Sequence, residues 1–397
     1  IFIIALIINK ISPFGNNMLS TSDSIVIFKP MLYDFITKLR SGTLLAYSFN
    51  NGLGNPTIFN FVYCLSSPLN LIAIFFKTPD TMYLSTFLFK LLIGSITMTY
   101  YVKTKTNNNF INFIATISYI FSSWFLTYYF YLPWLDIFVF FPLFQKGLED
   151  LLDKKKYNTY IIGLALVTIS HFYLAFPIYV YTVIYFIVYE LFYKKEDKKE
   201  KLLKFNIITL ATIVSFVLIF FFIYFIFDSF IKTGINFGGQ TANNYTISFI
   251  DFIKSLFYGN KNLMPLMYGK TFPNYACNTF IFINALYFFF NKNIEKRTKI
   301  FTAIGILLVL GAFFIKQFDF VLKFFHQIRG LTYRYTFIVE LLIIKMFITN
   351  ITTIKKEDFK KMLLTIPIII ILFAISFKSM NFNVRIFNIC SILAYTI

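Results

Sequence analysis

One acidic residue, Asp23, stands where a carboxylate could do chemistry. It lies in the run Ser22-Asp23-Ser24, and an apolar and aromatic stretch follows it. A carboxylate close to hydrocarbon is costly to ionise unless it has a partner, which makes such a group a candidate base or metal ligand. The alternative is that Asp23 caps a helix beginning near Ile25, as Asp commonly does. On the residues alone, capping is the simpler interpretation.

An arginine, Arg334, stands between Tyr333 and Tyr335 at the start of an apolar segment. There it would lie at the depth of the lipid headgroups, and a guanidinium binds phosphate through two parallel hydrogen bonds. This pattern indicates a clamp for a lipid phosphate. The alternative is a side chain that extends into the membrane interface without a ligand. Glu340, further along the same segment, could pair with Arg334 and would then be structural.

Two other motifs carry less specific signals. The turn-rich run Gly52-Leu53-Gly54-Asn55 could present backbone N–H groups to an anion, although a plain loop is the simpler explanation. The run from Leu132 to Asp136 lies at a predicted membrane boundary, where a residue such as Trp134 is an ordinary interface anchor. We expect Asp136 to cap the helix that follows.

The cysteines and histidines point to no cofactor. Three cysteines are scattered without a CxxC pair, and the two histidines lie far apart. This spacing predicts neither a disulfide framework nor a zinc site. The residues in question are Cys64, Cys277, Cys390, His171 and His326.

The composition is that of a membrane protein. Of 397 residues, 58% are hydrophobic and 14% are charged, against roughly a quarter charged in soluble domains. A soluble fold would lack polar residues to cover its surface, whereas lipid tails solvate apolar side chains directly. The net charge of +19 falls in short clusters between apolar stretches. Such clusters hold loops in the cytoplasm, so we do not expect a nucleic-acid partner.

The apolar stretches predict an all-α, polytopic bundle in which spans need about 20 residues each. We expect residues 1–397 to form a single transmembrane domain, truncated at both ends inside membrane helices. The predicted spans are 1–9, 81–102, 110–131, 135–152, 157–171, 173–193, 205–227, 277–291, 300–315, 335–350, 362–377 and 385–397.

Charge sets the predicted orientation. If 58–76 does not cross, five short loops face the cytoplasm with 19 Lys and Arg residues, and the longer outer segments hold 15. The positive-inside rule favours this arrangement. Pro56 and Ser66-Ser67-Pro68 also interrupt 58–76, so we expect an interfacial or re-entrant element there. The outer face then carries two long loops, 9–80 and 228–276, where a functional site is expected.

Six stretches, taken in order, resemble the YfhO-type bacterial membrane proteins, a branch of the GT-C superfamily of polyprenyl-phosphate-sugar-dependent glycosyltransferases. The resemblance covers nearly the whole chain. The chain departs from the family pattern at Val26, Ile27, His171 and Thr332, and it is shorter than most members. The matching stretches are Ser22-Asp23 with Pro30; Gly52-Leu53-Gly54-Asn55; Leu65-Ser66-Ser67-Pro68-Leu69-Asn70-Leu71; Trp134 with Pro142-Leu143 and Gly147-Leu148-Glu149; Ser170-His171-Phe172-Tyr173; and Tyr333-Arg334-Tyr335-Thr336-Phe337.

The resemblance implies a GT-C-like fold and a glycosyltransferase working on the outer face of a bacterial plasma membrane. Asp23 matches the family's acidic residue in the first outer loop, so it would be catalytic, acting directly or through a divalent cation. The implied partners are a polyprenyl-phosphate-linked sugar, membrane lipids, and an acceptor that is a lipid or a cell-envelope polymer such as lipoteichoic acid. The residues expected to bind the donor phosphate are Arg334, Lys29, Tyr333 and Tyr335. Those expected in loops near the site are Gly52, Gly54, Asn55 and His171.

Two other classes of function remain open on the sequence. A lipid or lipid-linked-sugar transporter would need charged or broken helices meeting in the middle of the bilayer. The predicted spans offer few such residues, namely Lys90, Glu340 and Lys345, and the last two could pair with each other. A structural membrane scaffold is the third class.

Overall fold

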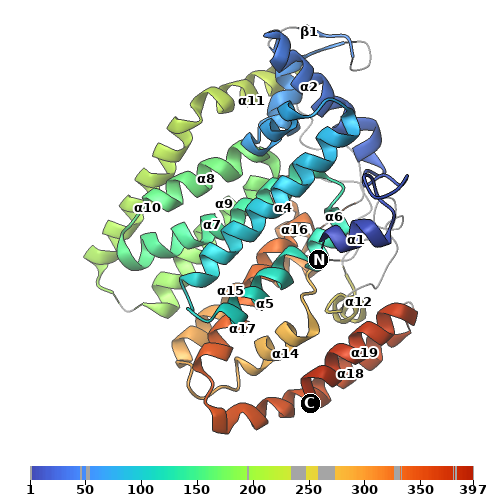
Figure 1. Ribbon diagram of the computed structural model, residues 1–397. Coiled ribbons are helices and arrows are strands. Elements are labelled where there is room, and N and C mark those ends of the chain that lie inside the picture. Colours follow the sequence, from blue (N-terminus) through green and yellow to red (C-terminus); the bar gives the residue numbers. More distant parts are fainter. Residues whose placement is uncertain are drawn as a thin grey trace.

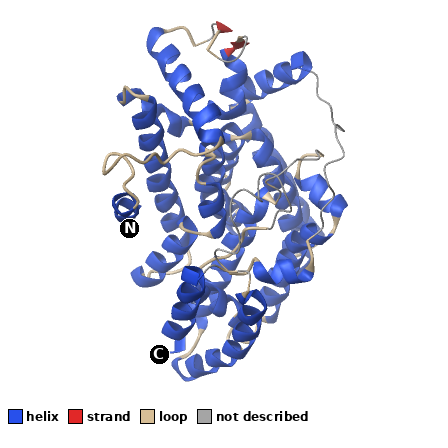
Figure 2. Ribbon diagram, turned by 90° about the vertical axis from the view of Figure 1, so that its right-hand side faces the viewer, coloured by secondary structure: helices blue, strands red, loops and turns tan. Residues whose placement is uncertain are grey.

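The computed structural model is an all-α bundle, as predicted, and its described residues also include one small strand pair (Figures 1 and 2). The structure describes residues 2–44, 47–50, 54–194, 196–233, 247–257, 273–325, 331, 333–378, 380 and 382–396. Gly52 and much of the second long loop therefore lie outside the described residues.

The N-terminal part consists of short elements that turn often. Gly42, with φ of 71°, ends α2 in the left-handed conformation that glycine adopts readily. Ser67 caps the next turn by accepting a hydrogen bond from the backbone N–H of Leu69, just before Pro68 begins a new helix. The elements are α1 (Phe2–Ile8), η1 (Ser24–Phe28), α2 (Lys29–Ser41), β1 (Tyr47–Ser48), β2 (Asn55–Pro56), α3 (Thr57–Asn60), η2 (Phe61–Leu65) and η3 (Pro68–Phe75).

Longer helices follow and form the centre of the bundle. Helix α4 begins with a reciprocal cap between Thr78 and Thr81 and has Pro79 in its first turn, where a missing N–H costs nothing. The elements are α4 (Pro79–Lys103), α5 (Asn109–Ile120), α6 (Ser123–Tyr128), α7 (Leu132–Lys154), α8 (Asn158–Ser170), α9 (Phe172–Val188), η4 (Tyr189–Tyr193), α10 (Lys198–Leu218) and α11 (Phe220–Thr233).

The C-terminal part packs against this centre through α17, while α18 and α19 follow the lower right edge in Figure 1. The elements are α12 (Phe249–Lys254), α14 (Thr279–Tyr287), α15 (Lys296–Phe314), α16 (Lys316–Leu322), η5 (Arg334–Thr336), α17 (Phe337–Thr353), η6 (Lys356–Thr365), α18 (Ile366–Phe377) and α19 (Phe382–Thr396).

Seven helices in the described part of the chain are long and apolar enough to cross a membrane, and the number is eight if a bent pair counts as one span. That pair is Thr57–Leu65 and Pro68–Phe75, whose axes differ by 110°. The bend lies at the predicted interruption, which fits a re-entrant or broken element at 58–76. Residues Asn109–Tyr128, which include α5 and α6, count as one span, as predicted for 110–131. The helix predicted for 205–227 instead begins at Lys198 and ends at Leu218. The seven candidate spans do not include the predicted spans 1–9, 135–152, 157–171, 277–291 and 385–397.

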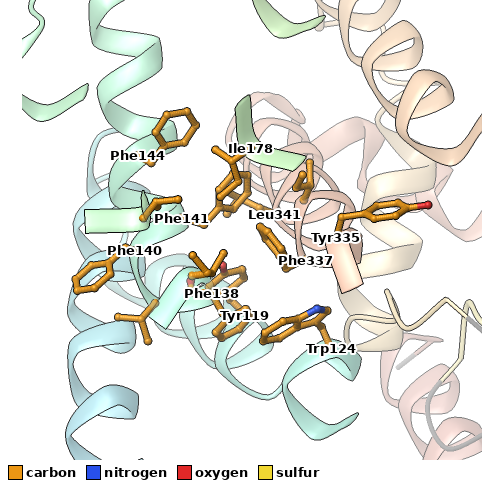
Figure 3. Close-up of a cluster of buried hydrophobic side chains, with 14 of the residues drawn as sticks. Tyr119, Trp124, Phe138, Phe140, Phe141, Phe144, Ile178, Tyr335, Phe337 and Leu341 are labelled. Carbon is orange, nitrogen blue, oxygen red and sulfur yellow. The ribbon is translucent and has the colours of Figure 1, made fainter. Parts of the chain in front are cut away.

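The core is aromatic, and the cluster drawn in Figure 3 lies where α5, α6, α7, α9 and α17 meet. Trp124 stacks on Phe138 with ring centres 5.2 Å apart, and Phe337 meets Trp124 edge-on. Helices α7 and α8 approach closely because Gly147 has no side chain. A Cβ there would lie 2.4 Å from the backbone nitrogen of Tyr160. This core fixes the helix ends that carry the candidate site.

The bundle has two chemically different ends. At one end of α4, Asp80 in the first turn accepts a hydrogen bond from Lys29, which is close to Asp23 in the chain. At the other end, α4 ends at Lys103, two residues before Lys105. Ion pairs join three of the predicted cytoplasmic loops at this second end, which is consistent with their placement on one side of a membrane. The pairs are Lys105–Glu149 at 2.5 Å, Lys155–Glu200 at 2.7 Å and Lys194–Asp153 at 3.7 Å.

Candidate functional site

Asp23 does not cap the helix that follows it. Its side chain makes no capping bond to η1, and the hydroxyl of Tyr131 donates a 2.5 Å hydrogen bond to its Oδ2 atom. The preceding residue, Ser22, has φ of 52°, a conformation that few side-chain-bearing residues adopt. The capping interpretation is therefore wrong. The turn instead directs the carboxylate toward the start of α7.

Tyr131 connects Asp23 to a second aromatic ring. Its ring stacks on Trp134 with centres 4.2 Å apart and planes 11° apart, and Phe28 meets it edge-on. Burial and the neighbouring negative charge of Asp23 raise the pKa of the Tyr131 hydroxyl. The phenol therefore stays protonated and remains a donor to the carboxylate.

Arg334 lies on the other side of Trp134. Its Cζ atom is 4.4 Å from the centre of the Trp134 ring and 5.8 Å from that of Tyr173, so aromatic faces flank the guanidinium. The Nε atom donates to the carbonyl of Leu331 at 2.8 Å, and Trp124 donates to the carbonyl of Arg334 at 2.7 Å. Within the described part of the chain, no acceptor bonds the two Nη groups. The guanidinium is thus held in place through Nε, and its Nη groups remain as donors for an anion.

One hydrogen bond, one ring stack and one cation–π contact therefore connect Asp23 to Arg334, through Tyr131 and Trp134. Both charges also act electrostatically on the hydroxyls of Tyr131 and Tyr63. The acid and the arginine, 311 positions apart in sequence, thus stand at the two ends of one chain of contacts. The predicted pair is brought together by the start of α7.

His171 lies beside this pair, between α8 and α9. Its Nδ1 atom accepts a hydrogen bond from the backbone N–H of Leu174 at 3.4 Å and so caps α9. Burial, together with the positive charge of Arg334, lowers the pKa of His171 to about 3. The imidazole is neutral there and helps to hold the helix end that carries Tyr173.

Three residues expected to bind the donor phosphate point elsewhere. Lys29 forms an ion pair with Asp80 at 2.7 Å. Tyr335 donates to Asp319 at 2.9 Å, and in Figure 3 its hydroxyl points away from the aromatic core. The ring of Tyr333 packs edge-on against a phenylalanine of α15. Their role in binding a phosphate stays a prediction. The aromatic rings around Arg334 come from Trp134 and Tyr173 rather than from its neighbours in sequence.

The glycine-rich loop near position 54 packs against α2. Gly54 has φ of +108°, and a Cβ there would lie 2.3 Å from the Tyr47 ring, so only glycine fits. The backbone of Asn55 pairs with Ser48 in the strand pair. Ser48 in turn donates to Asp34 at 2.9 Å. Gly52 lies outside the described residues. In the part that is described, this loop has no recorded contact with Asp23 or Arg334.

Other charged residues have partners that the sequence did not indicate. Glu340 accepts from the Ser122 hydroxyl at 2.6 Å and from the Trp124 backbone N–H at 2.8 Å, so it caps α6 and does not pair with Arg334. Lys345 pairs with Glu149 at 2.7 Å and not with Glu340. The expected cap at Asp136 is also wrong, because this residue pairs with a lysine of α4.

A divalent cation finds little to bind at this site. Among the described residues, no group of three His, Cys, Asp or Glu side chains could hold a metal ion. Asp23 alone therefore makes no all-protein metal centre, and a cation held by this carboxylate would need substrate phosphate and water as its other ligands.

Together these features define a polytopic helical membrane protein with an acid–arginine site at one end of its bundle. A family model described as bacterial membrane protein YfhO matches residues 1–397. The chain therefore belongs to the YfhO family of bacterial membrane proteins. Comparisons with curated proteins and with solved structures give no match.

Proposed function

We propose that this protein is a membrane-embedded glycosyltransferase. It would move a sugar from a polyprenyl-phosphate carrier to a cell-envelope acceptor, such as lipoteichoic acid or a lipid, on the outer face of the bacterial plasma membrane. The observation that carries the proposal is the connection of Asp23 to Arg334 through Tyr131 and Trp134. The family supplies the donor and acceptor classes by analogy.

Asp23 has the geometry of a general base. Tyr131 occupies its Oδ2 atom, and no donor bonds Oδ1 among the described residues. Oδ1 would take the proton from the acceptor hydroxyl as that oxygen attacks the anomeric carbon. The bond between this carbon and the phosphate oxygen breaks, and the electron pair leaves on the polyprenyl phosphate. Attack opposite the leaving group inverts the anomeric centre.

Arg334 has the geometry of a phosphate clamp. Trp134 and Tyr173 face its guanidinium, and Leu331 fixes its Nε atom. Its Nη groups would bind two phosphate oxygens and stabilise the charge that develops on the leaving group. The basic loops joined at the opposite end of the bundle support an outward-facing site, because such loops stay in the cytoplasm.

A transporter without bond chemistry finds less support. The charged residues in the central helices already have partners: Lys90 pairs with Asp136 and Lys345 with Glu149, and Glu340 accepts from Ser122 and Trp124. A transported group would have to break these bonds, and breaking one partner away from a buried ion pair is costly. An assay that follows labelled polyprenyl lipid across a vesicle, with sugar release scored separately, distinguishes the two functions.

The test is Asp23→Asn in proteoliposomes supplied with a labelled polyprenyl-phosphate sugar and an acceptor. We expect sugar transfer to disappear while insertion and thermal stability stay at the wild-type level. Asp358→Asn is the matched control and should keep full transfer, because Asp358 pairs with Lys361 in the C-terminal part of the bundle. Transfer by the Asp23 variant at the wild-type rate would remove this residue from the mechanism.

A further inference from the structure

Tyr63, in the bent element at 58–76, is exposed although the residues on either side of it are buried. Its side chain is 54% exposed, whereas Val62 and Cys64 are packed into the bundle. Val62 lies in an apolar cluster with residues of α11, and the Sγ atom of Cys64 lies 3.7 Å from the Sδ atom of Met31 in α2. Tyr63 therefore projects from a stretch that its neighbours hold in place, and it presents an apolar ring and a polar hydroxyl together.

The bent element is fixed against the helices that carry the candidate site. The Ser66 hydroxyl donates to a backbone carbonyl in the last turn of α8. The rings of Tyr63 and His171 lie 6.2 Å apart with planes at 53°, and the His171 ring lies 6.3 Å from that of Tyr173. The ring of Tyr173 is 5.8 Å from the Cζ atom of Arg334. A second chain of contacts thus leads to Arg334, and Tyr63 stands at its other end.

The hydroxyl of Tyr63 is available to a ligand. The charges of Asp23 and Arg334 both act on it, as they do on the hydroxyl of Tyr131. Tyr131 spends its proton on Asp23, whereas the Tyr63 hydroxyl makes no hydrogen bond within the described part of the chain. Because a phenol can both donate and accept, this group can bond a polar molecule that lies near the acid and the arginine.

The proposed reaction places the donor sugar in that position. The anomeric carbon is bonded to the phosphate at Arg334 and is attacked by an acceptor oxygen at Asp23, so the sugar ring must lie between these two residues. A tyrosine ring can pack on the apolar C–H face of a sugar while its hydroxyl bonds a sugar hydroxyl. The polyprenyl chain has no group for that hydroxyl to bond.

We propose that Tyr63 forms the subsite for the donor sugar, with its ring against the sugar and its hydroxyl bonded to a sugar hydroxyl, and that it helps to select which sugar is accepted. The inference rests on the proposed function for the identity of the ligand. The placement rests on the exposed side chain, its ring contact with His171 and its free hydroxyl.

Binding without turnover tests the subsite, because carriers can be compared that differ only in the sugar. Wild-type protein in nanodiscs is titrated, without acceptor, with undecaprenyl phosphate and with undecaprenyl phosphate that carries glucose or N-acetylglucosamine. Native mass spectrometry measures the bound fraction. We expect at least one sugar-bearing carrier to bind more tightly than the bare one. Tyr63→Phe should weaken binding of that carrier about tenfold, and Tyr63→Ala should weaken it further. Both variants should bind the bare carrier as wild type does.

Tyr224→Phe and Tyr224→Ala are the matched controls. Tyr224 of α11 is also 54% exposed and makes no hydrogen bond in the described structure, so its variants should bind every carrier as wild type does. Arg334→Lys should instead weaken all three carriers, because they share the phosphate. Equal losses of bare and sugar-bearing carrier in the Tyr63 variants would show a role in the fold or at the membrane interface and would overturn the subsite. So would unchanged binding in these variants, or a wild-type protein that does not prefer either sugar-bearing carrier.

Turnover then separates this inference from the proposed function. Tyr63→Phe should raise the KM for the donor about tenfold and change the ratio of kcat/KM between the two sugars, whereas Tyr224→Phe should do neither. Transfer with an unchanged donor KM in Tyr63→Ala would overturn the subsite and leave the glycosyltransferase standing. Sugar-dependent binding that Tyr63→Ala abolishes, in a protein that never transfers sugar, would keep the subsite and overturn the function.

Discussion

Lys90 of α4 and Asp136 of α7 form an ion pair in which both side chains are fully buried, with 2.7 Å between Nζ and Oδ2. The same ammonium donates to the carbonyl of Leu132 at 2.9 Å. Both bonds hold the first turn of α7, the turn that carries Trp134 and follows Tyr131. The ion pair thus positions the two rings that stand between Asp23 and Arg334.

The pair predicts a large penalty when only one partner is removed. Lys90→Met leaves a buried carboxylate without its cation, so we expect a loss of about 3–5 kcal/mol in stability. Lys90→Met combined with Asp136→Leu removes both charges and should recover most of that loss. Thermal unfolding in detergent, followed by size-exclusion chromatography, measures all three proteins. A single variant as stable as wild type would contradict this account.

Arg334→Lys should weaken donor binding while leaving the fold intact. Lysine keeps the charge but loses the planar contact with Trp134 and the two-pronged grip on phosphate. We expect kcat/KM for the carrier to fall about 10- to 100-fold, the loss of one charged hydrogen bond. Arg385→Lys is the matched control, because Arg385 also bonds a backbone carbonyl through Nε and lies over an aromatic ring. Equal effects of both substitutions would show that the loss is not specific to the site.

Tyr131→Phe removes a hydrogen bond and keeps the ring stack on Trp134. We expect kcat to fall about tenfold, because Asp23 loses the donor that orients it, with little change in Tm. Tyr129→Phe serves as the control, since its hydroxyl has no recorded hydrogen bond in the described structure. If Tyr131→Phe turned over at the wild-type rate, the bond would be irrelevant to catalysis.

His171 predicts a dependence of stability on acid. Its pKa is about 3 in the folded protein against 6.5 for an ordinary histidine, because burial and Arg334 disfavour the charged ring. The unfolded chain therefore binds a proton that the folded chain does not. Stability should fall as pH drops below 6.5, by about 1.4 kcal/mol per pH unit, and show no such effect above it.

His171→Asn can still cap α9 but cannot titrate. Comparing Tm for this variant and wild type between pH 7 and pH 5 isolates the histidine, because both proteins contain the same carboxylates. Parallel curves would show that His171 accepts a proton without cost.

Hydropathy and charge predicted the helical class, most spans, and the break in 58–76, because these depend on local runs of residues. Asp23 and Arg334 also stood out by type and context. The identity of their neighbours did not, since Trp134 and Tyr173 reach Arg334 only through the packing of α7 and α9. Likewise Glu340 caps a helix that lies more than 200 positions away. Such partners depend on the tertiary fold, and the spacing of residues in the sequence does not predict them.

The spanning helices differ in how much of their surface meets other protein. In the apolar window of α17 with η5, 72% of residues are buried, against 22% for α10. Lipid tails solvate different apolar side chains about equally well, so a position that faces lipid does not require one particular shape. Random exchange among Leu, Ile, Val and Phe should therefore be tolerated along α10, whereas α17 should accept few such exchanges. A mutational library of both helices would measure this difference in tolerance to apolar substitution.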